Sequence, residues 1–180
     1  MNAEEMIRLA LDTGFDHAGN LNVERLDFRQ AVRDMCASGQ CGNYGKCWTC
    51  PPYCGTLEES REKAAAFSDG ILVQTTGLME DDFDYESIRE AESRHKDNFL
   101  RLVKKLRSDG MKILPMGAGG CRICKACSCP EESCRHPEDA IISMEAYGLM
   151  VLDTCKASGM EYNYGPRTLT FTSAVLFGSR

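Results

Sequence analysis

The clearest periodic pattern lies near the middle of the chain, where apolar and aromatic side chains recur every three or four residues. The stripe consists of Ile88, Ala91, His95, Phe99, Leu102, Val103 and Leu106. This spacing places the side chains on one face of a helix. An acidic stretch, residues 80–84, precedes the stripe and complements the positive end of a helix dipole, and Gly110 follows it. We therefore expect one long amphipathic helix here.

Four shorter helices are predicted mainly from the residues at their ends. Asp27 with Gln30, and Thr56 with Glu59, have the spacing of a capping box, in which two side chains satisfy free amides at a helix start. Ser143 is expected to cap the last helix. The expected shorter helices cover residues 3–13, 27–36, 56–67 and 143–158.

Three short runs of β-type residues predict strands at 71–76, 111–116 and 168–177. The resulting order is strand, helix, strand, cysteine-rich loop, helix, strand. This alternation favours an α/β fold, with a small sheet of about three to four strands layered with helices and with two cysteine-rich metal-binding loops. We expect a single metal-binding domain over residues 1–180, because no low-complexity linker divides the chain.

Composition narrows the classes of partner. The hydrophobic share of 43% suits one compact core, and the formal net charge of −6 disfavours nucleic acid. No apolar stretch approaches the roughly 20 residues of a membrane helix. The first 13 residues lack the apolar region of a secretory leader. We therefore expect a cytoplasmic protein that binds neither nucleic acid nor membrane.

The eleven cysteines are the strongest indication of function in the sequence. A disulfide framework is disfavoured in a reducing cytoplasm. Ten of the eleven fall in two windows, 36–54 and 121–134, whereas structural cysteines would scatter through helices and strands. Thiols clustered in loops are typical of metal ligation.

The second window carries the strongest signal for a particular metal group. Cys121, Cys124 and Cys127 form a C-x2-C-x2-C motif, and Cys134 follows. Three cysteines at these spacings reach three irons of a cubane, and a fourth completes the site. The Cys-Pro pair of bacterial ferredoxins comes early here, at Cys129, which is an extra thiol, a ligand of another centre or an alternative fourth ligand. Structural zinc and free or redox thiols are the alternatives.

The first window also holds enough thiols for one centre, at Cys36, Cys41, Cys47, Cys50 and Cys54. Five cysteines exceed four ligand places, so at least one is spare. Cys54 just precedes a predicted helix, whose dipole favours a thiolate. Enzymes that cleave S-adenosylmethionine by radical chemistry use C-x3-C-x2-C. The order of the spacings is reversed here, so we discount that interpretation. A zinc site is the alternative.

In combination, these residues resemble a known family. The motifs are Cys41-Gly42-Asn43-Tyr44-Gly45-Lys46, Cys50-Pro51-Pro52, the triple-cysteine run with Cys134-Arg135-His136-Pro137, and Ser143-Met144-Glu145-Ala146 with Gly148. They look like the "predicted metal-binding protein" family of anaerobic bacteria and archaea, a domain of unknown function with the number twenty-two eighty-four. The resemblance covers nearly the whole chain. It implies metal binding through cysteines and no established reaction.

The resemblance also sorts the cysteines. The family positions look like Cys36, Cys41, Cys50, Cys121, Cys124, Cys127 and Cys134, whereas Cys47, Cys54 and Cys129 look like additions. For this reason Cys47 is the first that we leave out. The predicted metal ligands are Cys36, Cys41, Cys50, Cys54, Cys121, Cys124, Cys127 and Cys134.

Four other features have simpler interpretations. His95 and Cys155 lie on apolar helix faces and are interpreted as core residues. His136 is a metal ligand or a hydrogen-bond donor to cluster sulfur. The glycine-rich run 117–120 follows a strand but lacks the spacing of a nucleotide-binding motif.

Three functions fit these observations: an iron–sulfur electron carrier or redox accessory protein, an enzyme with an open cluster site, and a zinc-stabilised interaction module. For the first we expect two four-iron clusters and a redox partner protein, whose docking face should be basic because the chain is acidic. The second cysteine loop should leave the carboxyl end of the strand 111–116. The first loop should enter near the opposite edge of the sheet, unless the preceding helix brings it back. We therefore expect two separate centres.

Overall fold

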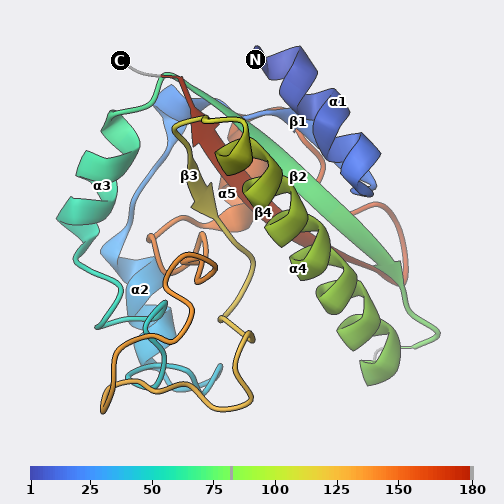
Figure 1. Cartoon of the computed structure of the whole chain (residues 1–180). Coiled ribbons are helices and arrows are strands. Elements are labelled where there is room, and N and C mark those ends of the chain that lie inside the picture. Colours follow the sequence, from blue (N-terminus) through green and yellow to red (C-terminus); the bar gives the residue numbers. More distant parts are fainter. Residues whose placement is uncertain (82, 179–180) are drawn as a thin grey trace.

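The computed structural model describes residues 1–81 and 83–178, which form helices on both faces of one antiparallel sheet (Figure 1). The strands are β1 (His17–Asn20), β2 (Asp69–Leu78), β3 (Leu114–Met116) and β4 (Thr168–Phe177), in the order β1-β2-β4-β3. Strands β2 and β4 pair along their full length, from Asp69 opposite Phe177 to Leu78 opposite Thr168. The expected α/β fold with a small sheet is confirmed.

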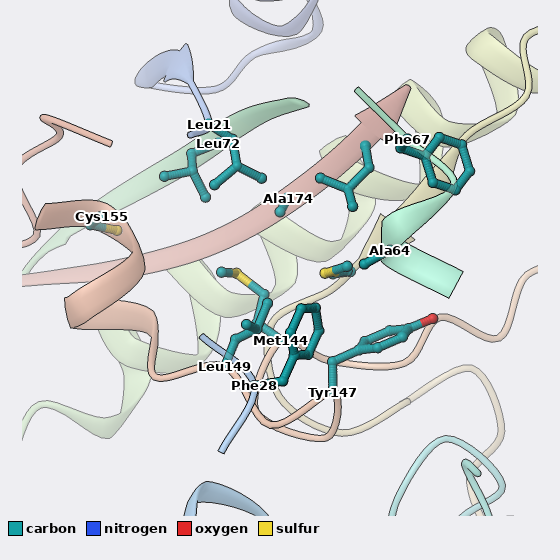
Figure 2. Close-up of a cluster of buried hydrophobic side chains, with 12 residues drawn as sticks. Leu21, Phe28, Ala64, Phe67, Leu72, Met144, Tyr147, Leu149, Cys155 and Ala174 are labelled. Atoms are coloured by element: carbon teal, nitrogen blue, oxygen red, sulfur yellow. The ribbon is translucent and has the colours of Figure 1, made fainter. Parts of the chain in front are cut away.

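Successive residues of the central strands point to opposite faces, so each strand serves two cores. On one face, Ile71 and Val73 of β2 pack with α1 (Ala3–Thr13) and α4 (Tyr85–Ser108). On the other face, Leu72 packs with residues of α3 (Leu57–Ala65), α5 (Val151–Ala157) and the segment between Met144 and Leu149. Figure 2 shows this second core. The remaining helices are α2 (Gln30–Ala37) and the short 3-10 helix Val23–Arg25.

Two predicted helices are confirmed, and each begins after a residue whose side chain caps it. The long helix α4 begins after Asp84, whose side chain accepts a hydrogen bond of 3.0 Å from the Ser87 amide. The predicted stripe is buried, apart from Ile88 at its start. Thr56 and Glu59 form the expected capping box at the start of α3. No helix in the part of the chain that the structure describes is long and apolar enough to cross a membrane.

The predictions for the starts of two other helices are wrong. Asp27 forms an ion pair of 2.6 Å with Arg29, while Phe28 bridges to Leu149, so α2 begins only at Gln30. The helix expected from Ser143 begins at Val151. A helix cannot run through this segment, because Gly148 has a positive φ of 92° and lies close to Leu57 and the Arg29 backbone.

Candidate metal centre

The two cysteine loops lie side by side at one end of the molecule, below the sheet in Figure 1. Trp48 of the first loop donates a hydrogen bond of 3.0 Å from Nε1 to the carbonyl oxygen of Glu132 in the second. Asn43 packs so closely on Gly120 that a Cβ there would lie 2.5 Å from Asn43 Nδ2. The two segments therefore form one surface.

The prediction that the first loop enters near the opposite edge of the sheet is wrong. It assumed that the loop lies where the following strand, β2, begins. Helix α3 separates the two and runs back from the loop toward the start of β2 (Figure 1). The first loop is thus one helix length away from that edge, next to the loop that leaves β3.

A cavity of about 420 Å³ lies between the loops. Its sulfur-bearing lining residues are Cys47, Cys121, Cys124, Cys127 and Cys134. All four predicted ligands of the second loop therefore face one space, and a thiol from the first loop joins them. The fifth residue, Cys47, is the one that our sequence argument left out. Its C-x2-C spacing to Cys50 was the signal that could have identified it.

Backbone amides favour a thiolate at one position in this cavity. Partial burial raises the pKa of Cys127, but hydrogen bonds from the amides of Cys129 and Trp48 outweigh it, with help from Cys47 and the nearby Arg135, so the pKa is lowered overall. Burial raises the pKa of the Cys121 thiol despite a hydrogen bond from the Ile123 amide. Backbone amides from both loops, those of Trp48 and Cys129, thus donate hydrogen bonds to the sulfur of Cys127.

The remaining cysteines of the first loop form a second group beside the cavity. Burial raises the pKa of Cys36, and the nearby thiols of Cys41 and Cys54 raise it further. Burial and the neighbouring Cys47 raise the pKa of Cys50 to about 12. The raised pKa values of Cys36 and Cys50 favour the protonated thiols at neutral pH, so metal binding at these two residues would release protons.

Two residues that we interpreted as core residues are confirmed as such. Cys155 on α5 is fully buried, and its sulfur lies 3.6 Å from Gln74 Nε2. His95 is fully buried between Thr75 and Ser173, with hydrogen bonds of 3.0 and 2.7 Å, and burial lowers its pKa to about 3. Neither residue lies in a cysteine loop.

The donor set in the cavity fits a thiophilic metal group. Within residues 1–81 and 83–178, no three Cys, His, Asp or Glu side chains already converge on one ion position. The thiols instead line a shared space, so they would turn inward on binding. Soft thiolate ligands select zinc, copper(I) or iron–sulfur clusters over hard cations.

In a comparison with protein families, residues 19–177 match the family described as "Predicted metal-binding protein (DUF2284)". This chain belongs to that family. Nothing matches among curated proteins or among solved structures. All eleven cysteines of this predicted metal-binding protein lie inside the matched range. The resemblance that we inferred from the motifs is confirmed.

Proposed function

We propose that this metal-binding protein holds two four-iron, four-sulfur clusters and carries electrons. The observation that carries the proposal is the cavity of about 420 Å³ with five thiols from two loops on its wall. Cys121, Cys124, Cys127 and Cys134 would hold one cluster. Cys36, Cys41, Cys50 and Cys54 would hold the other, with Cys47 between the two groups. A bound cluster accepts and releases single electrons.

The cavity supports a cluster over a single zinc ion. Four sulfurs around one zinc all lie about 2.3 Å from the metal, which leaves no room inside the site. A cubane spreads its cysteines over four irons, and the C-x2-C-x2-C run suits that arrangement. The amide donors at Cys127 add support, because hydrogen bonds to sulfur stabilise an anionic cluster.

If the protein carries electrons, its visible absorption should change reversibly when it is reduced and reoxidised. Protein prepared without oxygen should be brown, lose visible absorption on addition of dithionite, and regain it on mild reoxidation. Absorption spectra recorded through two such cycles in a sealed cell check this. A colourless protein, or one whose colour is lost for good in the first cycle, would argue against an electron carrier.

The charges around the cavity suggest the kind of redox partner. The chain has a net charge of −6, yet the cavity lining contains the cations Lys46, Lys125 and Arg135, together with Arg122, which forms an ion pair of 2.7 Å with Glu92. An electron leaving through this opening meets a locally positive field. We therefore propose a partner protein with an acidic docking face, the opposite of what the net charge indicated.

Salt dependence distinguishes local from net charge. Oxidation of the reduced protein by the anion cobalt(III)–EDTA should slow as salt is added, and oxidation by the cation hexaamminecobalt(III) should accelerate. Stopped-flow rates measure both. The double substitution Lys46→Glu with Lys125→Glu should reverse the sign of both salt dependences, that is, of the slope of each oxidation rate against ionic strength. Arg8→Glu, on α1 at the other end of the molecule (Figure 1), is the control and should leave their signs unchanged. Slopes that follow the net charge of the whole chain would contradict the acidic-partner proposal.

A further inference from the structure

Arg33 is a buried cation beside the first cysteine loop. It lies in the middle of α2, and only 7% of its surface is exposed. Its Nη2 donates a hydrogen bond of 2.6 Å to the Gly55 carbonyl oxygen and lies 3.7 Å from the Cys54 sulfur. Its Nη1 is buried without any hydrogen-bond partner. In the described part of the chain, no carboxylate forms a salt bridge with it.

A charge in this situation is costly. A guanidinium removed from water loses its hydration, and the charge stays unfavourable unless a negative group offsets that loss. Natural proteins rarely keep a buried Arg unless it is paired. We therefore expect a negatively charged group next to Nη1 of Arg33.

The groups around Arg33 indicate what that anion is. Cys36 follows one turn later on the same helix, which places both side chains on one face. Cys54 lies on the other side, in contact with Nη2. Arg33 favours the thiolate form of both, although burial raises both pKa values overall. The charge of Glu145 acts in the opposite direction and raises the pKa of Cys36. Its Oε2 atom is also buried without a hydrogen-bond partner, and within the described residues Glu145 forms no salt bridge with Arg33.

We propose that Arg33 is the built-in counter-charge of the metal centre at Cys36, Cys41, Cys50 and Cys54, and that its free Nη1 donates to this centre when metal is bound. Arg33 is then a positioning residue and not a ligand. The inference rests on the proposed function only in requiring a metal–thiolate group in the first loop. Four thiolates around zinc and four thiolates on a four-iron cluster are both anionic, so the counter-charge is needed with either metal.

The proposal predicts opposite effects on the two forms of the protein. In metal-free protein the unpaired guanidinium is a cost, so a neutral side chain of similar length should leave the stability unchanged or raise it. In the metal-bound protein the same change removes a compensating charge and a donor. An ordinary structural arginine would instead lower the stability of both forms when replaced.

The test compares Arg33→Met and Arg33→Lys with Arg8→Met, a control at an exposed helical arginine. Two quantities are measured: the rate at which a chelator removes metal, and the denaturant midpoint of the metal-free protein. For Arg33→Met we expect removal from one centre to be about 10- to 100-fold faster, the range seen when an outer partner of a metal ligand is lost. The metal-free midpoint should be unchanged or higher. Arg33→Lys, which keeps the charge, should lie close to wild type.

Three outcomes would overturn the role of Arg33. They are an unchanged removal rate in Arg33→Met, a parallel fall in metal retention and metal-free stability, or equal losses in the Met and Lys variants. The metal found in the wild-type protein tests the proposed function separately. Zinc in place of iron would refute the cluster, and the comparison of variants would still decide the role of Arg33.

Discussion

Replacing Cys124 with alanine is expected to strip the metal from the second loop, whereas replacing Cys155 should leave the metal content unchanged. Cys124 is half-buried and lines the cavity between the loops, at the middle of the triple-cysteine run. Loss of one ligand removes a large part of the binding free energy that holds the loop in place. Cys155 lies on α5 and is fully buried in the core, and its loss should cost only about 1–2 kcal/mol of stability.

Metal content per chain, measured on both variants prepared without oxygen, checks this assignment. The two substitutions are matched in chemistry, since each removes one thiol. Equal metal loss in the two variants would show that the cavity is not the binding site, or that metal content follows global stability.

Removing the metal is expected to loosen the two cysteine loops while the sheet stays folded. The two hydrophobic cores on β2 and β4 are built from apolar side chains outside the cysteine loops. The backbone hydrogen bonds within the loops are mostly turn contacts between residues three or four apart, such as Cys50 to Cys47 and Glu132 to Ser128. Arg33 adds an uncompensated charge beside one of the loops. A metal site supplies on the order of 10 kcal/mol, so amide exchange in residues 38–55 and 117–140 should accelerate about 100-fold or more.

Hydrogen exchange of the metal-bound and metal-free protein, followed by peptide, tests this prediction. Peptides from β2 and β4 serve as the internal reference and should keep their protection. Loss of protection throughout the chain at one common rate would contradict it, because the metal would then be needed for the whole fold.

The sequence predicted the elements whose signals are local. The stripe on α4 and the capping box at Thr56 each lie within a few turns of one helix, and both are confirmed. Strand β1 was missed because its four residues, His17–Asn20, include a glycine and have no alternation, and pairing with β2 alone defines it. The start of α5 was misplaced because Ser143 is used in a bridge to Gly117.

The candidate site shows the same difference: features with a local signal were predicted, and features that depend on tertiary contacts were not. The dense cysteine windows were enough to predict two metal-binding loops, because loop composition and ligand spacing are local properties. Their contact through Trp48 and Glu132 depends on the direction of α3, which no short pattern encodes. Arg33 was missed because a charged side chain on a helix usually faces water, whereas here Arg33 is buried and the apolar Met35 is 60% exposed.

The most direct test of the central claim is to measure iron, acid-labile sulfide and zinc per chain in protein purified without exposure to oxygen. Two four-iron clusters predict about eight irons and about eight sulfides per chain, without zinc. About four of each would mean that the loops share one cluster or that one loop is empty. Stoichiometric zinc without sulfide would contradict the iron–sulfur account.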